Sequence, residues 1–304
     1  MSADLVTADP RMRILLVSQY VSALRGMVRV CRRGGYQPVA AVCTRAESPT
    51  SGLSTPRMVT LSKALVGSCP PGLSVNVVDG MDPLCDVIER YSPDLLLVRG
   101  FPWRLPARAL QAPRFGAVNL HPSSLPEFRG PFPVDWAIRR GDSELGFTAH
   151  RMDAGFDTGR ILAAVRFPVG PDEFGGAIWS RVDAAAERVL APALDRVFGK
   201  DPGVDQDDSQ ASYAGAFDAD DEVVDWTRSA LEIHHQVRAW SLGSQGVEGP
   251  LADLDGSPVR IHRTSLTAID APRVSCRDAP IWLADFTRLP PGNTPSSERK
   301  ASVK

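Results

Sequence analysis

The sequence predicts an α/β protein with a doubly wound, mostly parallel sheet, followed by a small C-terminal β-rich module. Short apolar runs, such as residues 14–18 (ILLVS) and 94–98 (DLLLV), alternate with amphipathic stretches of helical length. This alternation is typical of parallel strands that are buried on both faces. The 304 residues, of which 43% are hydrophobic and 23% charged, suit a folded globular protein with one large domain and one small one.

The elements expected along the chain follow from periodicity and turn residues. Strands are expected over residues 14–18, 38–43, 73–78, 94–98, 116–120, 146–152 and 160–169. Helices are expected over residues 22–33, 82–91, 174–198 and 229–240. Gly34 and Gly35 should end the first helix, and Ser229 with Glu232 should form a capping box at the start of the last one. Residues 251–289 alternate short strand-like runs with Gly and Pro turns, which predicts the β module.

The charge distribution indicates the domain boundaries. Residues 1–200 carry 24 Lys and Arg against 19 Asp and Glu, whereas residues 201–304 carry 10 against 17. Nine of the acidic side chains, and no basic one, fall within 201–225, a composition typical of a solvated linker. We therefore expect a large domain over 12–200, an acidic linker over 201–225, a helix-plus-β module over 226–290 and a disordered tail over 291–304. Such a charge pattern disfavours a large nucleic-acid surface.

Several classes of protein are disfavoured by what the sequence lacks. It contains no apolar run of 18 residues and no secretory signal at its start, so we expect a cytoplasmic protein without a membrane span. Its five cysteines are scattered and form no CxxC pair, which argues against a disulfide framework and a metal site. The loop after the first strand (QYVSALRG) has neither G-x-G-x-x-G nor a Walker A run, so dinucleotide and nucleoside triphosphate sites lose their main support.

One stretch of the sequence has the residues of a catalytic site. Asn119 and His121 are two positions apart at the end of an expected strand, so they share a face at the carboxyl edge of the sheet. An amide beside an imidazole is suited to stabilising a carbonyl oxygen that gains negative charge. Asp157 lies in the glycine-flanked turn DAGFDTG. The alternative is a turn-capping Asn, a surface His and a plain hairpin, so the residues alone indicate an α/β enzyme with a site near residue 120.

The run NLHPSSLPEFRGPFPVDWAIRRGDSELGFTAHRMDAGFDTGRIL resembles the signature of the folate-dependent formyltransferases. This family includes methionyl-tRNA formyltransferase, glycinamide ribonucleotide transformylase and sugar-nucleotide N-formyltransferases. The resemblance covers N-x-H-P-S-x-L-P, then R-G-P, G-x-T and D-x-G-x-D-x-G in the family's order. As a Rossmann-like fold, the resemblance covers residues 12–200. The sequence motifs that carry it lie within residues 100–162. Residues 213–240 are similar to the region where longer members join a small C-terminal β domain.

The resemblance implies a formyl transfer from 10-formyltetrahydrofolate to an amine, without a metal. It assigns catalysis to Asn119, His121 and Asp157. Asn119 and His121 would stabilise the oxyanion, His121 would also transfer a proton, and Asp157 would orient His121 and help draw a proton from the amine. His150 is expected to pack beside the site without a catalytic role, and His234 and His235 are expected to be polar surface residues.

The resemblance also implies that two loops bind the pterin ring of the folate, mainly through backbone groups. The residues concerned are Gly100, Phe101, Pro102, Trp103, Leu105, Asp153, Ala154, Gly155 and Phe156. Phe101, Trp103 and Leu105 would supply apolar faces for a flat heterocycle. The alternative for Trp103 is that it plugs the end of the sheet.

The acceptor amine is expected to belong to a small molecule, such as an amino-sugar nucleotide, an ornithine-type amine or a natural-product amine. Relatives that formylate initiator tRNA carry basic side chains after the second strand, where residues 44–56 have one Arg and one Glu. The C-terminal span 226–304 has ten basic and eight acidic residues, and RNA binding needs several well-placed cations. A methionyl-tRNA formyltransferase is the first alternative. A folate-binding regulator without turnover is the second.

Overall fold

The computed structural model describes residues 12–48, 55–243 and 249–290. The expected tail over 291–304 and the middle of the 44–56 loop therefore lie outside the described residues. The chain divides into two compact units, which are treated separately below. Unit 1 comprises residues 1–126, 146–165 and 183–210, and unit 2 comprises residues 127–145, 166–182 and 211–304.

A seven-stranded sheet forms the framework of the large domain, as the alternating apolar runs predicted. Its strand order is β3-β2-β1-β4-β5-β6-β7. The strands are β1 (Arg13–Ser18), β2 (Gln37–Thr44), β3 (Ser74–Val78), β4 (Leu95–Arg99), β5 (Ala117–His121), β6 (Glu144–Arg151) and β7 (Ile161–Pro168). The first five pair in parallel, whereas β6 runs antiparallel to β5. The strand order reverses between β1 and β4, and sites of open α/β sheets form beyond the carboxyl ends of strands at such a point.

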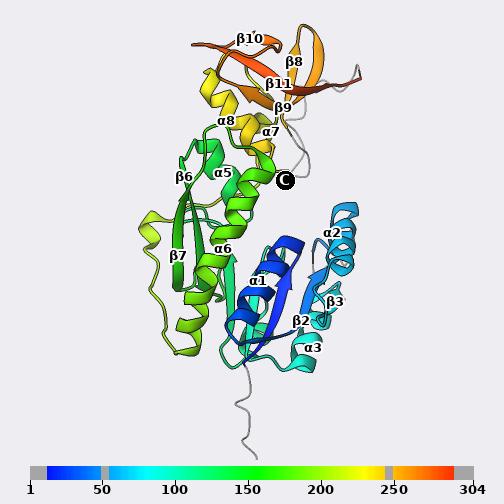
Figure 1. Ribbon diagram of the computed structural model, residues 1–304, viewed down its shortest axis with the longest axis vertical. Helices are drawn as coiled ribbons and strands as arrows, with labels where there is room; N and C mark the ends of the chain where they lie inside the picture. Colours follow the sequence, from blue (N-terminus) through cyan, green and yellow to red (C-terminus); the bar gives the residue numbers. More distant parts are fainter. Residues whose placement is uncertain (1–11, 49–54, 244–248, 291–304) are drawn as a thin grey trace, which may run out of the picture. The chain divides into compact units, whose positions relative to one another are not determined.

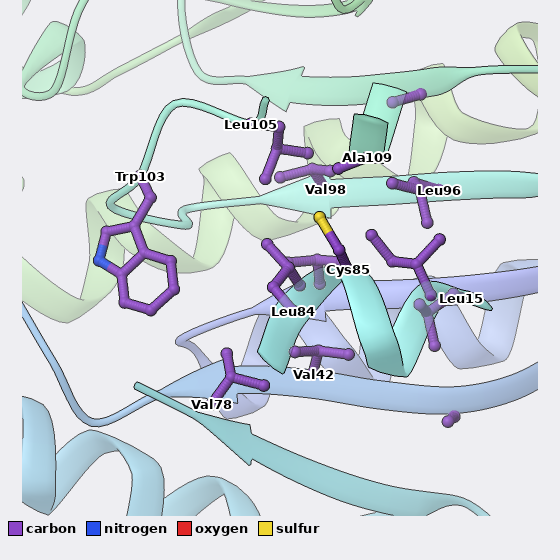
Figure 2. Close-up of a cluster of buried hydrophobic side chains, with 14 of the residues drawn as sticks. Leu15, Val42, Val78, Leu84, Cys85, Leu96, Val98, Trp103, Leu105 and Ala109 are labelled. Carbon is purple, nitrogen blue, oxygen red and sulfur yellow. The ribbon is translucent and has the colours of Figure 1, made fainter. Parts of the chain in front are cut away.

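Both faces of the sheet are buried at its central strands β1 and β4, whereas the edge strands β3 and β7 are partly exposed. The helices of the region are α1 (Val21–Arg33), α2 (Pro56–Gly67), α3 (Met81–Tyr91), α4 (Ala107–Gln111) and α6 (Gly175–Phe198), as drawn in Figure 1. Leu15 and Val17 point into a core shared with α3 and α4, part of which is shown in Figure 2. The alternate residues Ile14 and Leu16 have no exposed surface either, so the opposite face is covered as well.

The helix ends follow local sequence signals. Gly34 caps α1 and Gly35 takes a φ of 80°, as the glycine pair predicted. Helix α2 was not predicted from the sequence. It begins where Thr55 accepts a hydrogen bond from the Met58 amide at 3.3 Å and where Pro56 occupies the first turn.

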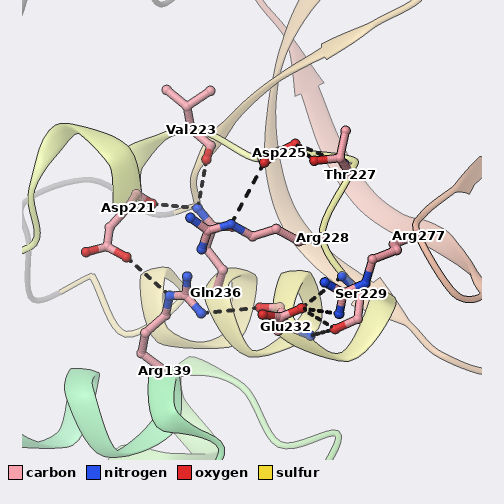
Figure 3. A network of polar contacts seen from close by, with 10 residues as sticks. All are labelled: Arg139, Asp221, Val223, Asp225, Thr227, Arg228, Ser229, Glu232, Gln236 and Arg277. Carbon is pink, nitrogen blue, oxygen red and sulfur yellow. Dashed lines mark hydrogen bonds and ion pairs between the residues drawn. The ribbon is translucent and has the colours of Figure 1, made fainter.

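Unit 2 contains the C-terminal module that the sequence predicted. Its elements include α5 (Pro133–Arg140), α7 (Ala219–Glu222), α8 (Ala230–Trp240), β8 (Leu251–Leu254), β9 (Ser257–Ser265), β10 (Arg273–Ser275) and β11 (Pro280–Arg288). The four strands form an antiparallel sheet in the order β10-β11-β9-β8. The capping box of Ser229 and Glu232 is present, and Figure 3 shows it within a polar network that ties α5, α7 and α8 together.

The expectation that both adjacent histidines of α8 are surface residues was wrong for His234. Its side chain is fully buried, and its ring nitrogens lie 2.9 Å from Thr264 Oγ1 and 3.0 Å from the Pro171 carbonyl oxygen. Helix α8 packs against α5 as well as β9, so two of its faces are covered rather than one. Burial lowers the pKa of His234, and it lowers that of the half-buried His235 to about 4.

Within the described ranges, no helix combines the length and apolar character that a bilayer crossing requires. All five cysteines are free thiols, and burial raises the pKa of Cys31 to about 12 and that of Cys43 to about 11. These two thiols are therefore poor nucleophiles.

Candidate active site

Two of the expected catalytic residues lie at the end of strand β5, at the carboxyl edge of the sheet. Asn119 and His121 are its third and fifth residues, so their side chains point to the same face. His121 is only 5% exposed, and Asn119 is half-buried. The chain turns away directly after His121, where the Ser123 amide donates to the His121 carbonyl at 2.9 Å.

Asp157 completes a contact between the three residues that the sequence singled out. The Asn119 amide donates to Asp157 Oδ1 at 3.0 Å, and His121 Nδ1 lies 3.6 Å from Asp157 Oδ2. The side chains of His121 and Asp157 are 6% and 12% exposed, so water screens their interaction only weakly. Asp157 has a φ of 55°, a left-handed backbone conformation that directs its carboxylate at the end of β5.

A fourth residue, His150, lies within this cluster. It is directly opposite Asn119 in the antiparallel pairing of β5 with β6. Its Nε2 lies 3.3 Å from Asn119 Nδ2 and 3.4 Å from Asp157 Oδ1. The sequence places His150 on the neighbouring strand, but only the strand register shows that it faces Asn119.

The tautomer of His150 follows from its other contact. His150 Nδ1 is 2.8 Å from the Arg151 carbonyl oxygen, which can only accept a hydrogen bond, so Nδ1 carries a proton. In the neutral ring, Nε2 then accepts from Asn119. In the charged ring, Nε2 faces Asp157 as a donor. One carboxylate thus lies between two imidazoles and an amide, an arrangement suited to moving a proton and to stabilising an anionic oxygen.

The G-x-T element of the motif supports the turn after His121. Thr148 Oγ1 donates to the Ser123 carbonyl at 2.7 Å and accepts from the Leu125 amide at 3.3 Å. A Cβ at Gly146 would lie 2.0 Å from Ser124 Oγ and 2.3 Å from the Ser124 nitrogen, so only glycine allows this approach. These residues therefore hold the turn that directly follows His121.

The first of the two expected folate-binding loops follows β4. Gly100 has a φ of 61° and is packed against Tyr20, Phe101 is half-buried, and Pro102 is exposed. Trp103 and Leu105 are 4% exposed and belong to the hydrophobic core (Figure 2). The Trp103 indole donates to the carbonyl oxygens of residues 46 and 47, each at 3.2 Å. This burial favours the alternative in which Trp103 plugs the end of the sheet.

The second expected loop, residues 153–156, is exposed and holds its own shape. Asp153 Oδ1 accepts from the Gly155 amide at 2.9 Å and from Thr158 Oγ1 at 2.6 Å. Arg104, which the sequence analysis did not single out, donates to the Ala154 carbonyl and lies 5.8 Å from the Phe156 ring centroid. Arg104 thereby joins the two loops beside the catalytic cluster. Within the described residues, no three His, Cys, Asp or Glu side chains are arranged so that they could hold a metal ion.

Comparison with known proteins by sequence identifies formyltransferases as the relatives of this chain. A family model described as formyl transferase matches residues 12–194. The chain is 36% identical over 182 residues to methionyl-tRNA formyltransferase from Geobacter sulfurreducens, which covers 60% of this chain and 56% of that protein. It is 37% identical over 150 residues to methionyl-tRNA formyltransferase from Pseudomonas paraeruginosa, covering 49% of this chain and 48% of that protein. The chain thus spans about half the length of the curated relatives it matches.

Solved structures with a similar fold have lower sequence identity. HypX from Aquifex aeolicus, in complex with tetrahydrofolic acid, has a TM-score of 0.62 at 19% identity, covering 91% of this chain and 44% of that one. The N-formyltransferase from Helicobacter canadensis, in complex with folinic acid and dTDP-3-aminofucose, has a TM-score of 0.63 at 15% identity, covering 90% and 98%. At these identities the likeness concerns the fold alone.

Proposed function

The chain belongs to the formyl transferase family, and on that premise we propose that it transfers a formyl group from 10-formyltetrahydrofolate to an amine. The observation that carries this proposal is the contact of Asn119, His121 and Asp157 at the carboxyl edge of the sheet. A regulator that only bound folate would have no physical need for a carboxylate, an imidazole and an amide gathered at one point.

The chemistry that the family resemblance implies for each residue is compatible with these contacts. Attack of an amine on the formyl carbon places negative charge on the formyl oxygen and positive charge on the nitrogen. His121 donates a hydrogen bond to that oxygen, which is the stabilisation that matters most in acyl transfer. Asn119 also donates to it, with the amide hydrogen that neutral His150 would otherwise accept and that becomes available when the His150 ring is charged. Asp157 stabilises the charged form of His121 and accepts the proton that the nitrogen loses. The proton then passes to the tetrahydrofolate nitrogen as the carbon–nitrogen bond breaks.

The donor would bind at the two loops that Arg104 joins. The backbone groups of Gly100, Phe101 and Pro102 and of residues 153–156 supply donors and acceptors for the edge of a pterin. Phe101 and the 54% exposed Phe156 supply apolar surface. Trp103 and Leu105 would support the first loop from within the core rather than contact the ring.

For the acceptor, we propose a small-molecule amine, such as an amino-sugar nucleotide, an ornithine-type amine or a natural-product amine. Residues 44–56, where relatives that formylate initiator tRNA carry basic side chains, contain a single Arg and no Lys. A tRNA acceptor stem requires several cations at the site of contact, whereas a small amine requires one pocket. The solved N-formyltransferase that holds dTDP-3-aminofucose shares the fold, so a sugar-nucleotide acceptor is compatible with this architecture.

Methionyl-tRNA formyltransferase is the second candidate function, because the curated relatives with the matching sequence carry that name. One assay separates the candidates. The protein is incubated with 10-formyltetrahydrofolate and, in parallel, with amino-sugar nucleotides, ornithine-type amines or aminoacylated initiator tRNA at about 150 mM salt. Formylation of a small amine supports our proposal. Efficient and salt-sensitive formylation of the tRNA would overturn it in favour of the second candidate, and folate binding without turnover would indicate the regulator.

A further inference from the structure

The beginning of the acidic segment is tied to the turn that carries Asp157. We refer to residues 201–206 as the strap. Arg151 Nη2 donates to the carbonyl oxygen of Asp201 at 2.8 Å, and the backbones of Ile161 and Val204 exchange two hydrogen bonds of 2.8 and 2.9 Å. All of these residues belong to unit 1. The strap is therefore attached on both sides of the catalytic turn, to Arg151 before it and, through one antiparallel bridge, to Ile161 after it.

The last residue of the strap reaches into the turn itself. Gln206 Nε2 donates to the Asp157 carbonyl at 2.8 Å and to the Gly159 carbonyl at 2.7 Å. A primary amide nitrogen has two hydrogens, and here both are donated to carbonyl oxygens of the same turn. Gln206 is half-buried, so water competes only partly for these two acceptors.

The turn requires such support because its backbone is unfavourable. The left-handed φ of 55° at Asp157 is costly for a residue with a Cβ, and it persists only where the surroundings hold it. Gly159 allows the backbone of the turn to pass close to the backbone of Arg151. A Cβ at this position would lie 1.9 Å from the Arg151 carbonyl oxygen. The two carbonyl groups that Gln206 holds are those of these two positions.

Two residues hold the turn through different groups. Asp153 accepts from the Gly155 amide and, across the turn, from the Thr158 hydroxyl. Gln206 holds the backbone carbonyl groups of Asp157 and Gly159, next to the catalytic carboxylate. Loss of Gln206 should therefore displace the carboxylate and leave the proposed folate-binding residues 153–156 in place.

We propose that Gln206 is a positioning residue for catalysis. By holding the carbonyl groups of Asp157 and Gly159, it keeps the Asp157 carboxylate within reach of His121 and Asn119. This inference rests on the proposed formyl transfer. It assigns a function to the segment that the sequence indicated only as a solvated linker.

The first test uses Gln206→Met, which keeps the length and the stem of the side chain and removes both donors. We expect kcat to fall about tenfold, the scale of a lost pair of hydrogen bonds, while KM for 10-formyltetrahydrofolate changes less than about twofold. The matched control is Gln210→Met, because the exposed Gln210 donates from Nε2 to the Asp207 carboxylate at 2.8 Å and not to the catalytic turn. An unchanged kcat, or a change confined to KM, would overturn the proposal.

The second test asks whether Gln206 acts through the carboxylate. In an Asp157→Asn background, Gln206→Met should cause no further fall in kcat, because residues that act as a unit are not additive. A further tenfold fall would show that Gln206 acts elsewhere.

A third readout does not depend on enzymatic activity. Amide hydrogen exchange over residues 157–160 should be faster in Gln206→Met and unchanged in Gln210→Met. If the wild-type protein formylates no amine, the proposed function fails while this exchange experiment still tests the positioning. Equal exchange in both variants would refute the role of Gln206 whatever the reaction.

Discussion

Removing the negative charge of Asp157 should lower kcat by two to three orders of magnitude. Asp157→Asn keeps the size and shape of the side chain and removes its charge. The 3.6 Å between His121 Nδ1 and Asp157 Oδ2 corresponds to about 5 kcal/mol between unit charges at an effective dielectric constant of about 20. Because Asn retains a hydrogen-bonding dipole, we expect about 3–4 kcal/mol of this stabilisation to be lost, which corresponds to a decrease in kcat of roughly 10²–10³-fold.

The measurement is the steady-state release of tetrahydrofolate with the acceptor that the screen identifies, supplemented by single turnover with excess enzyme. KM for the folate should change little, because backbone groups are proposed to bind the pterin. Asp205→Asn is the matched control. Asp205 lies on the strap, is paired with Arg160 at 2.8 Å, and its side chain is 78% exposed. A variant that kept most of its kcat would refute the assignment of Asp157.

Three further changes test other parts of the structure. His150→Phe keeps a ring of similar size but removes the contact with Asn119, and kcat should fall about tenfold in the same assay. Gly146→Ala would force a Cβ against Ser124, and urea unfolding should show a loss of about 1–3 kcal/mol. The pKa of about 4 for His235 lies below its ordinary 6.5, so the unfolded chain binds the proton first and stability falls as the pH drops from 6.5 toward 4. His235→Gln should reduce that fall in melting temperature, and an unchanged pH profile would contradict the reasoning.

Much of the fold could be predicted because its signals are local. A buried parallel strand must be apolar on both faces, so the continuous run at β4 identifies it without reference to its neighbours. The cap of α8 requires only Ser229 and a Glu three residues later. Helix α2 was missed because the stretch from 56 to 67 combines a weak apolar pattern with several β-branched and small residues, and its start depends on a single Thr–Pro pair.

The burial of side chains was harder to predict, because it depends on what packs against an element. From the sequence we expected Trp103 to supply a ligand-binding face, with a core position as the alternative, and its contacts with the carbonyl oxygens of residues 46 and 47 favour the core. His234 has the polarity of a surface residue. It is buried because α8 is covered by both α5 and β9, and its two ring nitrogens find partners there.

The sequence by itself determined the order along the chain of the seven strands of the main sheet and of helices α1, α3, α6 and α8. Through its resemblance to the formyltransferases it also indicated Asn119, His121 and Asp157 as one candidate site. Strand periodicity places the first two on one face, and the glycine-flanked turn marks the third. Only the tertiary structure decided that His150 faces Asn119 and that Gln206 holds the turn of Asp157. The physical reason is that antiparallel register and the path of an acidic segment are set by contacts between residues about 30 to 50 positions apart, and no local periodicity encodes such contacts.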